Sequence, residues 1–127
     1  MRYMMIVRGD ENFAASGPPP MELMEAIGKL GEEAMKTGKM VSMGGLQHSS
    51  KGATVALKKG KLITTDGPFT EAKEVIGGFT IMDLASKEEA IAEAVKFMEL
   101  HRKLWPKWDG VTEVRQMYEE GQMPEFG

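Results

Sequence analysis

Apolar positions recur along the chain with two different spacings, which predict the helices and the strands. Steps of three and four, typical of the buried face of a helix, occur in residues 20–36 and 87–105. Shorter runs that are apolar, or that alternate with polar residues, predict strands over residues 3–8, 40–43, 53–57, 61–65, 78–84 and 111–118. The predicted order is therefore strand, helix, strand, a pair of strands, strand, helix, strand.

Local signals mark the ends of these elements. Ser86 and Glu89 form a capping-box pattern before the second helix, in which each side chain bonds a free backbone N–H of the other. Gly38 favours the end of the first helix, and Pro106 ends the second. Glycine at the late position of Lys58-Lys59-Gly60 predicts a hairpin turn between the two central strands.

Two helices packed on one face of an antiparallel sheet would leave its other face bare. A chain of 127 residues has little else to cover that face, so a second copy of the sheet is the simplest cover. We therefore predict an α+β homodimer with sheets packed face to face, in which some of Tyr3, Met5 and Phe79 line the contact. One domain is predicted over residues 1–127, of which residues 119–127 form a polar tail with Met123 and Phe126 as docking anchors.

Composition narrows the class of protein. A formal net charge of −3, with basic residues dispersed, argues against nucleic acid as a partner. The absence of cysteine excludes disulfides, thiolate chemistry and cysteine-ligated zinc. No run approaches the ~20 apolar residues needed to span a bilayer, and Arg8, Asp10 and Glu11 interrupt any signal-peptide core. We expect a soluble, cytoplasmic protein that has no membrane partner.

The most informative stretch is residues 65–79, TDGPFTEAKEVIGGF. The Asp66 carboxylate can bond backbone N–H groups just ahead, Gly67 can take a positive φ, and Pro68 donates no N–H, so a strand must stop here. Phe69 is then a large apolar side chain held beside several charges. This pattern fits either a turn with a buried anchor or the wall of a ligand pocket.

The same stretch resembles the signature of the DGPF proteins, a branch of the YCII-related family. Similarity extends over about residues 1–118, in the segments Tyr3-Met4-Met5-Ile6, Gly45-Leu46, Ser49-Ser50-Lys51-Gly52 and Glu113-Val114-Arg115. The resemblance implies a ferredoxin-like domain that pairs into a dimeric α/β barrel. It implies little about activity, although a distant relative acts on chlorinated aromatic ring compounds and some members are encoded beside alternative sigma factors.

Asp66 is the best single candidate for a catalytic acid or base, because it ends a strand where Phe69 can shield it from water. Three carboxylates, Asp66, Glu71 and Glu74, lie close together in the sequence, but they lack a metal-ligand spacing and Lys73 lies among them. We expect no metal and no cofactor. The predicted ligand-binding residues are Asp66, Gly67, Pro68, Phe69, Glu71, Lys73, His48 and Ser42.

The two histidines do not complete a known mechanism. The relatives credited with chemistry resemble one another in pairing a histidine of the first helix with an acid, and residues 20–38 contain no histidine here. His48 lies in a loop where many members carry proline, and His101 lies near the end of the second helix. Trp105 and Trp108 could stack a planar ligand, cap the core or fill a dimer contact.

Two functions of different kinds follow. The first is a homodimeric small-molecule-binding domain, or a minor enzyme, with a pocket between sheet and helices bordered by residues 66–74. The second is a non-catalytic regulatory or interaction module, for example one associated with sigma-factor regulation. The sequence leaves open whether the protein is an enzyme at all.

Overall fold

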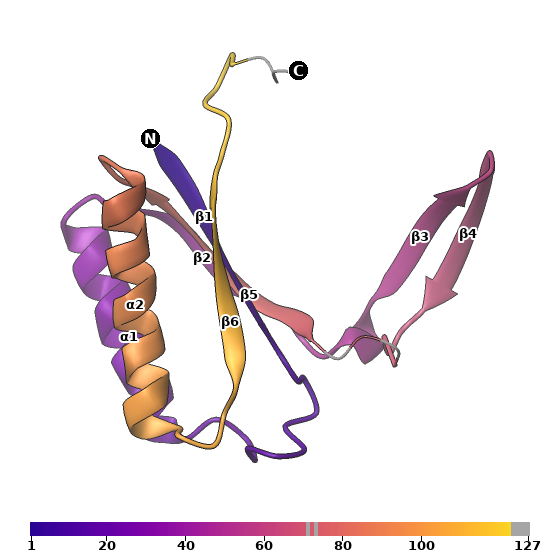
Figure 1. The fold of residues 1–127 in the computed structure, drawn as a ribbon, viewed down its shortest axis with the longest axis horizontal. Coiled ribbons are helices and arrows are strands. Elements are labelled where there is room, and N and C mark those ends of the chain that lie inside the picture. The colour runs from indigo at the N-terminus through magenta and orange to yellow at the C-terminus, as the bar shows by residue number, and fades with distance from the viewer. Residues whose placement is uncertain (71, 73, 123–127) are drawn as a thin grey trace.

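The computed structural model describes residues 1–70, 72 and 74–122. Their elements, in chain order (Figure 1), are β1 (Arg2–Gly9), α1 (Met21–Lys36), β2 (Met40–Gly45), a 3-10 helix (Ser49–Lys51), β3 (Ala53–Lys58), β4 (Lys61–Asp66), β5 (Val75–Asp83), α2 (Lys87–Leu104) and β6 (Gly110–Gln116). The predicted order is confirmed. Strand β5 begins at Val75, earlier than predicted, and β6 ends at Gln116, before the predicted residue 118.

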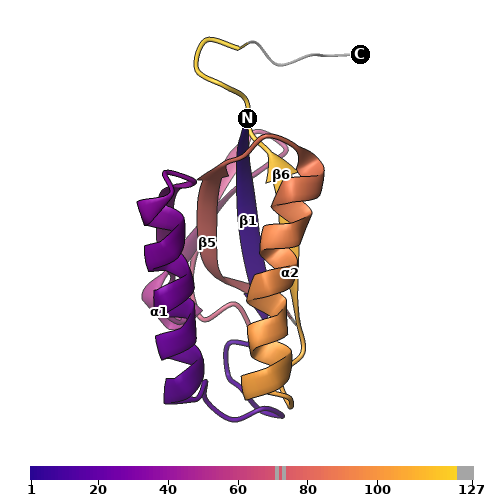
Figure 2. The ribbon, with the colours of Figure 1, turned by 90° about the vertical axis from the view of Figure 1, so that its left-hand side faces the viewer.

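The main sheet has the order β2-β5-β1-β6, with every neighbouring pair antiparallel. Helices α1 and α2 lie side by side over one face of it (Figure 2). This arrangement confirms the predicted α+β class and is consistent with a ferredoxin-like fold. Among the described residues, no helix combines the length and the apolar character that crossing a bilayer requires.

The helices begin and end largely where the sequence indicated. Ser86 Oγ accepts a hydrogen bond from Glu89 N (3.1 Å), while Glu89 Oε2 accepts one from Ala85 N (3.0 Å), one residue before the usual capping-box partner. Gly38 has φ of +75°, which glycine adopts without steric cost, and the chain leaves α1 there. Each helix therefore has local support for its position over the sheet.

The core lies between the sheet and the helices, and it corrects one prediction. Tyr3 and Met5 are 3% and 5% exposed and cluster with Ala90 and Ala94 of α2, so they face the helices and not a partner's sheet. Because side chains alternate along a strand, Ile6 and its cross-strand neighbour Phe79 lie on the opposite face. Only Phe79 of the three predicted contact residues lies there.

That opposite face carries no helix, and we call it the open face (Figure 1). Strand register places apolar side chains at its centre and an ion-pair group beside them on β1 and β6. In this group Glu113 accepts a hydrogen bond from Arg115 (2.9 Å) and pairs with Arg8 (3.3 Å). The bond from Arg115 lowers the pKa of Glu113, and the charge of Arg8 adds to this against a small opposing effect of burial. The apolar members of the open face are Met4, Ile6, Phe79, Ile81 and Val111.

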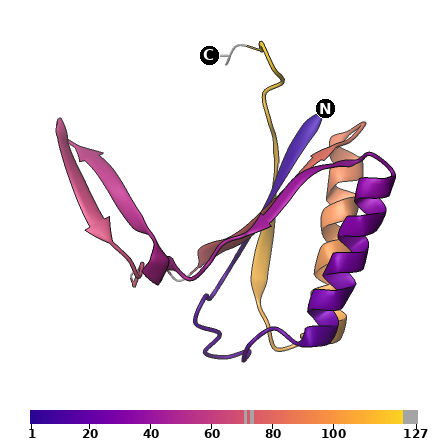
Figure 3. The same ribbon diagram turned by 180° about the vertical axis from the view of Figure 1, so that it is seen from behind.

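Strands β3 and β4 form a separate two-stranded hairpin, which we call the arm (residues 53–66). Figure 3 shows that the arm stands clear of the sheet on the side away from the helices. Lys59 and Gly60 at its tip have φ of +50° and +79°, as two-residue hairpin turns require. The predicted hairpin is thus confirmed. The tail anchors Met123 and Phe126 lie outside the described residues.

Candidate functional site

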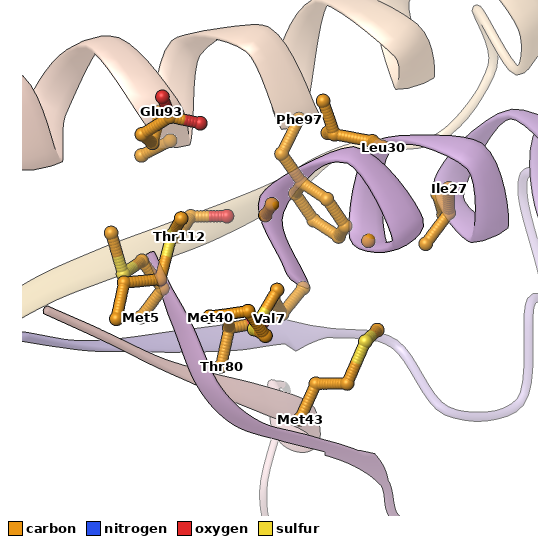
Figure 4. A pocket seen from close by; sticks show the side chains of 14 residues that line it. Met5, Val7, Ile27, Leu30, Met40, Met43, Thr80, Glu93, Phe97 and Thr112 are labelled. Atoms are coloured by element: carbon orange, nitrogen blue, oxygen red, sulfur yellow. The ribbon is translucent and has the colours of Figure 1, made fainter. Parts of the chain in front are cut away.

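A small cavity lies between the sheet and the helices, where a pocket was predicted (Figure 4). Methionine side chains from β1 and β2, with Phe97 of α2, line much of it. Its volume of about 50 Å³ suits a water molecule or two, whereas ligand pockets are usually several hundred Å³. This cavity alone is therefore too small for a metabolite.

A larger groove of about 500 Å³ adjoins the small cavity. The two share Val7, Ile27, Met43, Thr80 and Phe97. The groove lies toward the end of the molecule where the loop after β1 passes the start of α1 and the end of α2, and it reaches the 3-10 helix segment through His48. Its lining is mainly apolar, which suits the body of a small organic ligand.

Aromatic residues form one wall of the groove. Trp105 and Trp108 stack with ring centres 5.5 Å apart and ring planes inclined by 12°. The ring centre of Phe13 lies 5.6 Å from that of Trp105. Trp105 Nε1 donates to Ser16 O (3.3 Å), which ties the wall to the loop after β1. Offset rings of this kind can hold another flat ring against them.

Phe13 is held in an unusual conformation. Its φ of +53° lies in the left-handed region, which large aromatic residues rarely adopt. The surrounding turn enforces it: Asp10 accepts hydrogen bonds from Asn12 N (2.9 Å) and Ala14 N (3.1 Å), and Gly17 N donates to Phe13 O (3.0 Å). Such conformations cluster at functional sites, and here the result is an aromatic ring presented to the groove.

His101 is buried against the aromatic wall. Its Nδ1 lies 2.8 Å from Phe97 O, so Nδ1 carries the proton and Nε2 keeps a free lone pair. The ring centre is 4.6 Å from that of Trp108. Burial lowers the pKa of His101, against a smaller opposing effect of the bond to Phe97. A neutral imidazole that can accept a hydrogen bond therefore lines the groove.

Glu11 adds a carboxylate to the lining of the groove. Its oxygens accept hydrogen bonds from Ser49 N (2.7 Å) and from Ser49 Oγ. Burial raises the pKa of Glu11, but the two bonds from Ser49 and the nearby His48 outweigh it and leave the pKa lowered. Glu11 is thus a charged group with its side chain 15% exposed in a largely apolar groove.

His48, one of the predicted ligand-binding residues, also lines the groove. Its Nδ1 accepts a hydrogen bond from Ser50 N (3.1 Å), so its proton lies on Nε2. Nε2 is 2.8 Å from Asn12 Oδ1 and 3.6 Å from Glu11 Oε1. His48 therefore joins the 3-10 helix segment to the loop after β1, beside the Glu11 carboxylate.

The turn at residues 66–69 also packs against the 3-10 helix segment. Phe69 N donates to Ser49 Oγ (2.7 Å), and Gly67 N donates to Gly52 O (2.9 Å). A Cβ on Gly67 would lie only 1.8 Å from Ser49 O, so glycine is required there by close contact. The turn supports the groove wall through Ser49 and fixes the base of the arm.

The structure corrects two expectations about Asp66. Among the described residues its carboxylate makes no hydrogen bond. The backbone amides just ahead of it, those of Gly67 and Phe69, donate instead to the 3-10 helix segment. In the single chain Asp66 is also exposed, not shielded by Phe69. None of residues 66–70, 72 and 74 lines the groove, and Ser42 pairs with Ile81 on the open face. Glu71 and Lys73 lie outside the described residues.

Glu11 and Phe13 are groove residues that sequence reasoning did not select. Nothing in their spacing distinguishes them from ordinary loop residues, because the partners that place them come from residues 48–49 and from α2. The sequence offered only one signal for a site here, namely a carboxylate and an aromatic side chain close to three prolines that break helices. Within the described part of the chain, no group of three or more histidine or acidic side chains could hold a metal ion.

Comparison with known proteins places the chain in a family. The model of the YCII-related domain matches residues 1–98. The chain belongs to the YCII-related family. It is also similar to an uncharacterized protein of Rhizobium meliloti (strain 1021), with 27% identity over 128 positions that cover 98% of this chain and 99% of that protein. The similarity of this YCII-related protein to that relative thus extends over nearly the whole of both chains.

Proposed function

We propose that this YCII-related protein is a homodimeric small-molecule-binding domain whose ligand lies in the groove between Glu11 and the tryptophans. The observation that carries the proposal is the combination of an apolar groove of about 500 Å³ with a charged carboxylate and an aromatic wall in its lining. A few fixed polar groups in a largely apolar recess are what binding sites for small organic molecules require.

The groove chemistry favours one class of ligand. A flat, mostly apolar body fits against Trp105, Trp108 and Phe13. A hydrogen-bond donor or positive group on the ligand suits the Glu11 carboxylate, and a donor near the tryptophans suits His101 Nε2. If the protein is also an enzyme, neutral His101 is better placed in the groove than the proposed Asp66 to accept a proton.

The homodimer is supported by the open face. It presents partly exposed apolar side chains of three strands with no covering layer in the single chain, and a second copy would cover them. Pairing two open faces would give the face-to-face sheet arrangement that the family resemblance implies. The same surface also favours the alternative function, an interaction module without catalysis.

A thermal-shift screen tests ligand binding. A library of aromatic amines, amides, phenols and aromatic acids should contain compounds that raise the melting temperature, because a ligand of the native state stabilises it. Trp108→Leu should weaken binding of such a compound by about fivefold, from loss of ring contacts worth about 1 kcal/mol. Tyr118→Leu, which alters an exposed aromatic outside the described groove lining, is the matched control and should bind as wild type. Equal weakening in both variants would contradict the groove assignment.

A further inference from the structure

The arm presents an apolar surface that the rest of its own chain does not cover. Val55, Leu57 and Leu62 are 67%, 70% and 73% exposed. Leu57 and Leu62 are direct cross-strand partners, and Val55 lies two residues before Leu57, so all three share one face of the hairpin. A single hairpin is marginally stable in water, and an apolar face on it requires a partner surface.

The charge of the arm differs in sign from that of the body. Three lysines, Lys58, Lys59 and Lys61, stand at its tip against one aspartate, Asp66, which gives residues 53–66 a formal charge of +2. Because the whole chain carries −3, the remaining residues carry −5. The body of another copy of this chain is therefore electrostatically complementary to the arm.

The position of the arm favours the same occupant. The arm and the open face lie on the same side of the sheet, opposite the helices (Figures 1 and 3). When two copies place their open faces together, each arm extends on the side where the other copy lies. A two-fold arrangement uses both arms equivalently and closes the assembly, as dimers of identical chains do.

We infer that the arm of each chain docks on the body of a second copy, with the face of Val55, Leu57 and Leu62 against that copy and the lysine tip toward its carboxylates. This inference rests on the proposed homodimer and adds to it. The contact between open faces sets the dimer axis, and the arms hold the two copies together from outside it. The turn at residues 66–69, bonded to Ser49 and Gly52, then sets the direction in which each arm leaves the body.

Sedimentation equilibrium on the full chain tests the arm separately from the open face. Leu57→Ser combined with Leu62→Ser should raise the dimer dissociation constant at least tenfold, since a symmetric dimer loses four docked leucines. Met21→Ser removes an equally exposed apolar residue (72%) at the start of α1 and should leave the constant unchanged. The dimer dissociation constant of the wild type should also rise when the salt concentration is raised from 0.05 to 0.5 M, because salt screens the attraction between complementary charges.

The outcomes separate the two claims. One outcome would overturn the docked arm and support the face-to-face homodimer. In it, the wild type and the arm variant dimerise equally well, whereas Ile6→Glu on the open face dissociates the dimer. A wild-type monomer at micromolar concentration would overturn both. Hydrogen exchange gives an independent reading: the amides of residues 53–66 should become slower to exchange as the protein concentration rises through the dissociation constant. Exchange of the arm that is independent of concentration in a confirmed dimer would contradict docking.

Discussion

At the scale of single residues, Ser49 connects three parts of the chain that are distant in sequence. It is 5% exposed, its amide and hydroxyl donate to Glu11, and its hydroxyl accepts from Phe69 N. The groove carboxylate, the 3-10 helix and the turn at the base of the arm therefore depend on one small side chain. Asp66, which sequence reasoning placed at the centre of the site, has no such set of partners among the described residues.

This contrast gives the first prediction. Ser49→Ala should lower the free energy of unfolding by about 1–3 kcal/mol, because it leaves Phe69 N and a Glu11 oxygen without a partner. Asp66→Ala, a change at an exposed position nearby, should stay within about 0.5 kcal/mol of wild type. Urea unfolding at pH 7 compares them. A larger loss in the Asp66 variant would show that this carboxylate shapes the turn after all.

The Glu11 carboxylate adds a pH dependence to the same test. Its pKa is lowered in the folded state, so its contribution to stability is present above the ordinary carboxyl pKa of 4.5 and is lost as pH falls through the folded value. Ser49→Ala removes a bond that lowers this pKa. The stability difference between Ser49→Ala and wild type should therefore shrink as the pH is lowered below 4.5.

At the scale of elements, the strands and helices were predictable because their signals are local. The apolar run of β1, the steps of three and four in α1, and the Ser86–Glu89 cap each lie within a few residues. The assignment of Tyr3 and Met5 to the open face was wrong because β1 is apolar on both faces, so alternation alone could not say which face the helices cover. The groove was not predictable for a related reason: Glu11, His48 and Trp105 meet only in three dimensions.

Helix α2 carries a further testable group at its last turn. The pKa of His101 is lowered by burial, so the unfolded chain binds a proton more readily than the folded protein. Stability should therefore fall as pH decreases below the ordinary histidine pKa of 6.5, until the folded value is reached. The free energy of unfolding of the wild type should be lower at pH 5.5 than at pH 7.5. This difference should be smaller in His101→Gln. A pH dependence unchanged by this substitution would place its origin elsewhere.

At the scale of the whole molecule, the proposed functions rest on two uncovered surfaces, the open face and the arm, and on the groove. The proposed association uses the open face and the arm, whereas the groove lies near the loop after β1 and the ends of the helices. Phe79 belongs to the open face and also lines the groove, so association and binding are best altered separately through the arm and the tryptophans. Substitutions in the arm should change dimerisation while leaving the groove residues in place, and Trp108→Leu should do the reverse.

The central claim, that the groove binds a small molecule, can be tested through the tryptophans. The chain has two tryptophans and both line the groove, so two indole N–H signals in a proton–nitrogen correlation spectrum report on it; Trp108 also borders a second recess beside α2, so the Trp105 signal is the one specific to the groove. Addition of a compound that raises the melting temperature should shift both indole signals in a saturable way, with the same dissociation constant. Stabilising compounds that move backbone signals elsewhere while both indole signals stay fixed would contradict the account.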